Sequence, residues 1–576
     1  MPSDERALAT WLAALDDVAL AATFAARGVG LRSGWNDFFD AAEALLDTAT
    51  LEKLIVTLDR DTLTLLAGDA TPSPQAQDRA QLLALLSENH TPFGAVAAVV
   101  KTLQAQHPDA FVAAAPPSAP AVADSAQSAA AAERAFAASG SLADIVLACL
   151  HGPFTRTGTG TVSAADRKRL IDDGAVDEAD ELEDALLVAS TAGLVRAGDR
   201  VWTVTDAGEA WLEASTLSRW SQIVAGIRDA LPADLRTPDG GVVDIRMWAT
   251  LRPLDLDWPA QVTRFQRIAE RWGIIDATGA EPVWTTPLRE GGDIDTAPLG
   301  ALLATEIDRV YLQADLTAIA PGPLQPALDL RLRSVAHRES RAQASTYRFT
   351  AESLTAGMTD GETAASIRAF LGELSLTGIP QPLEYLIDST AQRHGLVQVR
   401  TDAATGRTAV SSTERSVLQT ISVDQALRSL GLVPDGDALM SRVGRDAVYW
   451  TLADARYPVV AVDDDGNAEP VRRRSVEVPT GPIPDATELY APLVKTLRTG
   501  HGTDGEAGWL ERELEQAVRA RGEIVVTVRM PDGSERSFTL EATGLGGGRL
   551  RGRDRAADIE RTLPVSSIVS VVPADA

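Results

Sequence analysis

Residues 310–319 read Val-Tyr-Leu-Gln-Ala-Asp-Leu-Thr-Ala-Ile, a mostly apolar run of the length expected for a buried β-strand. The break Pro321-Gly322-Pro323 ends this run, because proline has no backbone N–H to donate to a sheet. The elements expected after it are an arginine-rich helix, a strand at 346–349, a helix opening at 352, a helix at 364–374, a helix opened by residues 378–382, and a closing strand at 395–399. This stretch therefore predicts an α/β domain, and it contains no obvious catalytic group.

Periodicity and composition divide the rest of the chain into further domains. Apolar residues at helical spacing predict a helical N-terminal domain, and an Ala/Pro/Ser-rich stretch after it predicts a linker. Short strands and the turn Pro531-Asp532-Gly533 predict a small C-terminal β-barrel of SH3 or Sm type. The expected fold class is multidomain α/β (α+β). The expected domains are a helical domain at 1–112, a linker at 113–140, a winged helix at 141–215, a second winged-helix-like domain at 216–300, the central α/β domain at 305–400, an α/β extension at 401–466, a linker at 467–489 and the barrel at 490–576.

The two winged-helix predictions depend on a sequence pattern that occurs twice in the chain. Residues 181–192 predict a helix that ends at Gly193, and residues 194–204 then predict a hairpin that closes with Val-Trp-Thr. A second helix at 258–272 ends at Gly273, and residues 274–285 again end with Val-Trp-Thr. The repeat of helix, glycine and Val-Trp-Thr indicates tandem winged helices.

Charge and cysteine content limit the possible functions. The 576 residues include 81 acids and 53 bases, for a net charge of -28. That charge excludes a uniformly basic nucleic-acid wrapper and favours a protein partner, although local basic patches can still contact DNA. Cys149 is the only cysteine in the sequence, so a thiolate metal cluster cannot form and a reducing compartment is expected. With no signal layout or apolar run of membrane-spanning length, we expect a cytoplasmic protein with no membrane partner.

No motif predicts an enzyme. The tetrapeptide Asp177-Glu178-Ala179-Asp180 spells a helicase motor motif, but it follows a polar stretch where a motor would have a buried strand. The phosphate-binding pattern G-x-x-x-x-G-K-[ST] is absent from the sequence. The six histidines lack metal-ligand spacing, and no serine lies in a nucleophile elbow. We therefore expect no catalytic residue, no metal, no cofactor and no ATP-driven motor in this chain.

Arginines in one expected helix form the first candidate nucleic-acid site. Arg264, Arg267 and Arg271 have the spacing that places them on one face of the helix at 258–272. A winged helix would lay such a face in a DNA groove, and a solvated face paired with acids is the alternative. The corresponding helix of the first copy carries acids at 181, 183 and 184, which phosphates would repel, so that helix is expected to bind protein.

A second candidate site follows a run of three glycines near the C-terminus. Arg549, Arg551, Arg553 and Arg555 alternate along an expected strand, and this period places all four on one side. Such a stripe would suit phosphate or an acidic partner. The alternative is an ordinary exposed face of the expected barrel.

The central stretch resembles the domain found near the N-terminus of XPB-type DNA-repair helicases, as it appears in actinobacterial helicase-associated proteins. The resemblance rests on the sequences at 312–317 with the Pro-Gly-Pro that follows, at 346–354, at 367–374 and at 379–383. It implies an XPB-N-terminal-like domain with a role in damage recognition or in docking between subunits. Residues 510–572 are similar to the WYL-type barrel of bacterial regulators, although they lack the Trp-Tyr-Leu signature itself.

These observations lead us to expect a non-catalytic, helicase-associated accessory factor in DNA repair or other DNA transactions. It would dock onto a separate helicase, XPB-type or other, and contact DNA through its arginine patches. One alternative is a transcription regulator of winged-helix and WYL type, which would bind a defined duplex site. Another is a nuclease with an acidic site that the sequence does not reveal, which would cleave DNA with magnesium.

Overall fold

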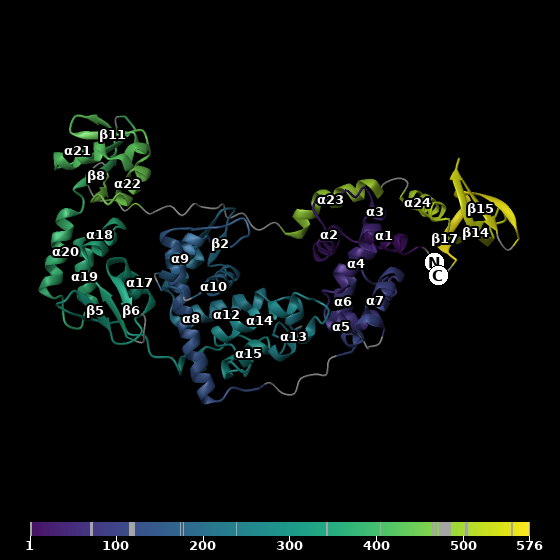
Figure 1. Ribbon diagram of the computed structural model, residues 1–576, viewed down its shortest axis with the longest axis horizontal. Helices are drawn as coiled ribbons and strands as arrows, with labels where there is room; N and C mark the ends of the chain where they lie inside the picture. The colour runs from purple at the N-terminus through teal and green to yellow at the C-terminus, as the bar shows by residue number, and fades with distance from the viewer. Residues whose placement is uncertain are drawn as a thin grey trace. The chain divides into compact units, whose positions relative to one another are not determined.

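The computed structural model is a mixed α/β multidomain chain whose described residues form four small sheets (Figure 1). It describes residues 3–574 apart from 69–72, 114–120, 173, 177, 238, 341–343, 404, 464–465, 467–468, 470, 472–484, 502–504 and 555–556. The chain divides into two compact units. Unit 1 comprises Met1–Ala119, Val243–Thr263 and Thr480–Ala576, and unit 2 comprises Pro120–Val242 and Arg264–Pro479.

The N-terminal part of unit 1 is helical, as the apolar spacing predicted. Most of its helices begin at a Ser or Asp whose side chain accepts a backbone N–H of the first turn, as Asp37 does for the N–H groups of Phe39 and Asp40. The elements are α1 (Asp4–Ala14), α2 (Asp17–Ala26), α3 (Phe38–Leu46), α4 (Thr48–Ile55), α5 (Arg60–Ala67), α6 (Pro74–Leu82), α7 (Gly94–Gln106) and the 3-10 helix η1 (Pro108–Phe111).

Two helices from the far end of the sequence complete this helical core. They are α23 (Ala486–His501) and α24 (Gly505–Ala520). Tyr490, Leu497 and Trp509 are buried in the same core as the N-terminal helices, and Figure 1 shows α23 lying beside α2 and α3. Arg512 of α24 pairs with Asp37 and Asp40 of the N-terminal part. Segments more than 400 residues apart in sequence therefore share one core.

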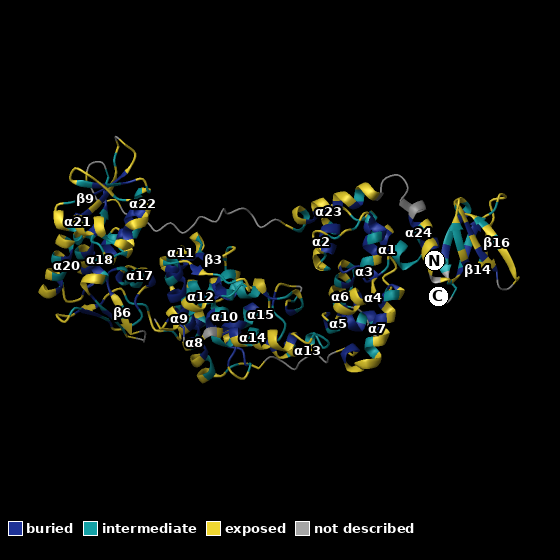
Figure 2. Ribbon diagram, turned by 45° about the horizontal axis from the view of Figure 1, so that its top comes forward, coloured by how far each residue is buried: buried dark blue, intermediate teal, exposed yellow. Residues whose placement is uncertain are grey.

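The C-terminal strands form an open sheet, so the expected closed barrel is wrong. The antiparallel order is β16-β15-β14-β13-β17, and among the described residues the edge strands β16 and β17 pair with one neighbour each. Each edge strand ends in a proline, Pro564 or Pro573, which cannot donate to a further strand. The predicted hairpin turn at Gly533 is confirmed, with a φ of +82°. Figure 2 shows both buried and exposed stretches on this sheet. The strands are β13 (Glu523–Arg529), β14 (Glu535–Gly546), β15 (Arg549–Asp554), β16 (Ile559–Pro564) and β17 (Ile568–Pro573), with η6 (Val565–Ser567) before the last.

Unit 2 begins with a long helix, α8 (Ser125–His151). The alanine-rich end of the expected linker is therefore helical, because alanine favours helix and because Asp124 and Gln127 form a capping box. The predicted hairpin is confirmed as β2 pairing with β3, and β1 adds to it in the order β1-β3-β2. The elements after α8 are β1 (Phe154–Thr155), α9 (Ala164–Asp172), α10 (Ala179–Thr191), β2 (Val195–Ala197), β3 (Val201–Val204), α11 (Asp206–Glu213) and α12 (Thr216–Ala230).

The second expected hairpin, at 274–285, does not form. Residues Val283–Thr285 are a 3-10 helix, η4, and no strand occurs among the described residues 274–285. Side chains connect the two segments instead, because Trp284 Nε1 donates to the Gly273 carbonyl at 2.9 Å and Thr285 Oγ1 donates to the Ile274 carbonyl at 2.7 Å. The elements of this part of the sequence are η2 (Ala233–Leu235), η3 (Ile245–Met247), α13 (Trp248–Leu251), α14 (Trp258–Arg271), α15 (Thr286–Arg289) and α16 (Ala297–Gly300); residues 243–263 among them belong to unit 1.

The central domain follows its predicted order only in part: the single strand expected at 310–319 is wrong, because residues 313–316 form a turn between two short antiparallel strands, and the strand at 337–340 was not predicted. Its antiparallel sheet has the order β4-β5-β7-β6, and helices from both sides of β7 in the sequence pack into the same core. Leu316 has a φ of +67° in the turn between β4 and β5, and the Asp315 carboxylate fixes this turn by accepting the Thr317 N–H and hydroxyl. The elements are β4 (Tyr311–Leu312), β5 (Thr317–Ala320), α17 (Pro326–Val335), β6 (His337–Ser340), β7 (Ser345–Arg348), α18 (Ala351–Thr359), α19 (Ala364–Leu374) and α20 (Gln381–Arg393).

A second small sheet follows the central domain. Its order is β10-β11-β9-β8-β12, antiparallel except for β12, which runs parallel to β8. The predicted strand at 395–399 is confirmed as β8 of this sheet. Among the described helices of the whole chain, none is long and apolar enough to cross a membrane. The elements are β8 (Val397–Thr401), β9 (Thr408–Ser412), α21 (Arg415–Val423), η5 (Gln425–Leu430), β10 (Val433–Asp435), β11 (Ala438–Ser441), α22 (Arg445–Asp454) and β12 (Val459–Ala461).

Candidate nucleic-acid interface

The arginines of α14 contact the acidic helix α10 of the same unit. Arg264 Nε donates to Asp184 Oδ1 at 2.7 Å, and Arg267 Nε donates to Asp184 Oδ2 at 2.7 Å. Arg271 pairs with Glu181. The Asp184 side chain is only 5% exposed, whereas the three arginine side chains are between 36% and 48% exposed. The sequence predicted that the acidic helix α10 binds another protein, but its acids pair with arginines of the same chain.

These ion pairs limit how the α14 arginines can bind a phosphate. The hydrogen bond to Asp184 raises the pKa of the Arg267 guanidinium, so this group stays charged. A phosphate that approached Arg264 or Arg267 would have to compete with a carboxylate that both arginines already hold. Another acid of α10, Glu183, pairs with Arg167 of α9, with Oε1 3.7 Å from Arg167 Nη2. A role for α14 in nucleic-acid binding stays a prediction. Such binding would require the arginines to leave these ion pairs.

The second arginine group lies on β15 with the predicted alternation. Arg549, Arg551 and Arg553 are exposed, and the residues between them are buried. Arg555 lies outside the described residues. The three described arginines therefore share the outer face of the sheet, and their alternation with buried residues confirms the period of two.

The two ends of this stripe differ in their surroundings. Arg553 donates to Asp558 at 2.6 Å, and the hydrogen bond raises the pKa of Arg553. Its cross-strand neighbours are Glu541 and Glu560, so this end of the stripe is neutralised. No ion pair with another described residue is found for Arg549 or Arg551. The residues opposite them on β14 and β16 carry no charge and are Gly546, Pro564, Gly544 and Thr562.

Sequence reasoning missed a buried charge cluster between α8 and the central domain. Asp144 of α8 accepts a hydrogen bond from Arg333 Nη1 at 2.7 Å and also pairs with Arg338. The Tyr347 hydroxyl donates a hydrogen bond to Asp329 Oδ1, and burial together with this carboxylate raises the pKa of the tyrosine. The available signal was Asp144 itself, a carboxylate with apolar neighbours on both sides in an otherwise apolar helix segment.

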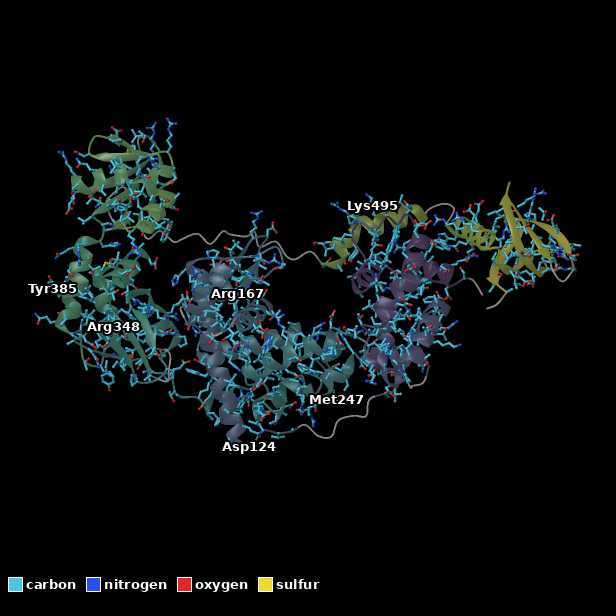
Figure 3. The ribbon with its side chains drawn as sticks, viewed as in Figure 1. Asp124, Arg167, Met247, Arg348, Tyr385 and Lys495 are labelled. Carbon is cyan, nitrogen blue, oxygen red and sulfur yellow. The ribbon has the colours of Figure 1, made fainter. Side chains whose placement is uncertain are left out.

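The outer surface of the central domain carries paired charges and an exposed aromatic residue. Arg331 Nε donates to Glu362 at 2.8 Å, and Arg348 pairs with Glu339. Tyr385 of α20 is 75% exposed, and its side chain stands on the outer side of that helix (Figure 3). An exposed tyrosine offers an apolar ring and a hydroxyl to a partner, which is the chemistry of many protein interfaces.

The remaining sequence candidates occupy ordinary positions. Glu178 and Asp180 lie at the exposed start of α10, and Asp177 lies outside the described residues. Cys149 is buried, and burial raises its pKa to about 11, which disfavours the thiolate. Among the residues that the structure describes, no group of three or more His, Cys, Asp and Glu side chains is arranged to hold a metal ion.

The central domain matches a known family. The family described as helicase conserved C-terminal domain matches residues 310–434, which comprise the central domain and the second sheet as far as β10. Among curated proteins, none matches the chain. The match includes the stretch that resembles XPB-type N-terminal domains, but its description is that of a helicase C-terminal domain. The XPB-type and WYL-type likenesses stay predictions.

The match corrects one expectation. The sequence motifs led us to expect a protein without enzymatic activity, and that expectation is wrong as stated, because the match points to a helicase-family protein and such proteins are typically enzymes. The matched domain does not by itself assign a catalytic activity to this chain. Residues 310–434 thus form a helicase C-terminal-like domain, and this match suggests a helicase-related protein.

Proposed function

We propose that this protein acts in a helicase-driven reaction on nucleic acid, as a factor that associates with a separate helicase and contacts DNA beside it. The observation that carries the proposal is the helicase C-terminal-like domain at 310–434. The exposed Tyr385 of this domain is the side chain we assign to helicase docking, because aromatic anchors contribute much of the energy of protein interfaces. DNA repair is the process that the XPB-type likeness favours.

The nucleic-acid contact is assigned first to β15. The chain as a whole has a charge of -28, so its general field repels a phosphate backbone. Arg549 and Arg551 face solvent with uncharged residues opposite them, so their guanidinium groups can each contact a phosphate. Arg553 would add a contact only when it leaves Asp558, and a contact by Arg555 stays a prediction from the sequence.

The α14 arginines are proposed as a second contact that operates when α10 releases them. Arg264, Arg267 and Arg271 have half-exposed side chains, so phosphates can reach them from solvent. Changing them to glutamate would place like charges against Asp184 and disturb the fold. Glutamine is therefore the appropriate change in a binding experiment.

The decisive experiment is affinity capture of the tagged full chain from native lysate, with nuclease added, followed by ATPase assays of the captured material. We expect a helicase to co-purify in spite of the nuclease, and its ATPase rate to change when the chain is added back. The variant Tyr385→Ala should capture several-fold less helicase. The matched control is Leu256→Ala, which removes a 95% exposed side chain outside the matched domain and should capture as much as the wild type.

Repeated capture without any helicase would contradict the proposal, because it would remove the docking role.

A second candidate function is DNA recognition by a transcription regulator. The sheet order β1-β3-β2, with α9 and α10 preceding the hairpin, is the arrangement that favours it. A regulator would bind one duplex sequence far more tightly than unrelated duplexes at the same salt concentration. Equal affinity for all duplexes in a randomised-sequence selection would remove this candidate.

A further inference from the structure

Unit 2 contains a cavity of about 450 Å³ between α8, α12 and the central domain. This volume lies within the range of protein sites for small molecules. One part of its wall is apolar and is formed by Phe136, Leu302, Leu303 and Leu324. Another part contains the buried charge cluster of Asp144, Asp329, Arg333, Arg338 and Tyr347. The cavity therefore combines apolar surface with convergent polar groups, as ligand sites do.

The charges that line the cavity balance. Its arginines are Arg219, Arg333 and Arg338, and its acids are Glu133, Asp144 and Asp329. Arg219 is also held by hydrogen bonds to the carbonyl groups of Trp211 and Leu212, and burial lowers its pKa to about 10. A ligand with a net charge would lose its hydration on entry and find no net opposite charge in return. The lining thus favours an uncharged ligand with hydrogen-bond donors and acceptors.

Two features of α8 leave room and hydrogen-bonding capacity in the cavity. The Ser139 hydroxyl is buried and has no hydrogen-bond partner among the described residues, a state that folded proteins avoid. Gly140 lies inside the 27-residue helix, and a Cβ added there would meet no atom within 4 Å. Glycine weakens a helix interior, and no neighbouring atom requires it at this position. Both residues line the cavity.

We propose that this cavity binds an uncharged, ring-sized organic molecule with an amide-like edge. Its ring would lie against the apolar wall, and its donor and acceptor atoms would face the charge cluster and the Ser139 hydroxyl. Both the winged-helix-like part and the central domain contribute to the wall, so an occupant would contact the two together. The site is independent of the proposed helicase association, and its test does not involve a helicase.

The test uses three probes of equal shape and different charge: neutral 2-naphthamide, anionic 2-naphthoate and cationic 2-naphthamidine. Binding to the full chain is measured by saturation-transfer NMR titration. We expect 2-naphthamide to bind at least about threefold more tightly than either charged probe, because the lining has no net charge. The variant Gly140→Phe should fill the space and abolish the signal. Gly372→Phe is the matched control, because Gly372 is also an open helical glycine but lies on α19 outside the cavity lining.

A second variant protects the test against misfolding of Gly140→Phe. Ser139→Ala removes the unpartnered hydroxyl, so we expect an unchanged or higher Tm together with an affinity for 2-naphthamide that falls about threefold or more. The proposal is overturned if either charged probe binds more tightly than 2-naphthamide, or if none of the three binds. It is also overturned if folded Gly140→Phe binds like the wild type, or if Ser139→Ala lowers the Tm and leaves the affinity unchanged.

Discussion

The two arginine groups, on α14 and on β15, use the same residue type and differ in what lies next to it. On α14, Arg264 and Arg267 hold one buried carboxylate, Asp184, from a helix about 80 residues earlier in the chain. On β15, Arg549 and Arg551 have uncharged residues opposite them on both neighbouring strands. Whether a basic cluster is available to a ligand is therefore decided by the element packed against it. Its spacing along the sequence shows only which face it occupies.

The largest effect should come from removing the carboxylate shared by the α14 arginines. Asp184→Ala leaves Arg264 and Arg267 without their partner, and we expect local destabilisation of about 1.5–3 kcal/mol, because two charge-assisted hydrogen bonds are lost while the half-exposed arginines stay solvated. Hydrogen exchange of the α10 and α14 amides measures this loss. The matched control is Glu183→Ala on the same helix, which breaks a more exposed pair with Arg167 and should cost less than about 1 kcal/mol. Equal exchange rates in the two variants would show that the α10–α14 pairs add no stability.

A smaller effect is expected from reversing the free charges of β15. The double change Arg549→Glu and Arg551→Glu should weaken binding to a duplex about tenfold or more at low salt. The slope of log K against log salt concentration should become shallower by about 2, because two phosphate contacts are lost. Fluorescence anisotropy over a salt series measures both quantities.

The control for this pair reverses two exposed arginines elsewhere in the same unit. Arg519 lies on α24, and Arg536 lies on β14 with a side chain on the other face of the sheet from β15 Arg551. Changing both to glutamate alters the net charge by the same amount. If this control weakens binding as much as the β15 variant does, the effect comes from net charge, and β15 is not the contact.

The smallest effect is expected from removing the ion-pair partner of a third arginine, Arg553. Asp558→Asn removes the carboxylate that pairs with Arg553, and duplex affinity should rise about two- to fivefold. The fold should tolerate the change, because Asp558 has a φ of +50° and asparagine is among the residues that accept this conformation. The same anisotropy titration is the measurement, and an unchanged or lower affinity would place the nucleic acid away from this end of the stripe.

Local patterns predicted the local structure well. The hairpin at 194–204 was predictable because a tight turn joins two strands that are adjacent in sequence. The alternation of exposed and buried residues along β15 was predictable because successive side chains of a strand point to opposite faces. The helices of the central domain were also readable, because each begins at a recognisable cap or proline, as α18 does at Thr350. The strand expected at 310–319 was not, because the turn at Leu316 divides it into β4 and β5. Such features depend on residues a few positions apart.

Features that depend on distant segments could not be predicted from the sequence. The α10–α14 pairing joins residues about 80 positions apart, and the Asp144–Arg333 pair joins residues 189 apart. The second Val-Trp-Thr was misread as a strand, because Trp284 and Thr285 are anchored by side-chain hydrogen bonds that periodicity does not reveal. The barrel was expected from short strands and their turns, but closure depends on whether the edge strands pair.

The shared core of the two chain ends has a consequence for biosynthesis. Trp509 and Arg512 contact the N-terminal helices, so these helices lack part of their core while the ribosome makes the intervening roughly 400 residues, which takes about 20–80 s at ordinary elongation rates. During that interval Phe39 has no indole to pack on, and Asp37 and Asp40 have no guanidinium. The N-terminal helices therefore stay incompletely packed during this interval. Chaperones that shield apolar surface would have their main opportunity to bind them at that time.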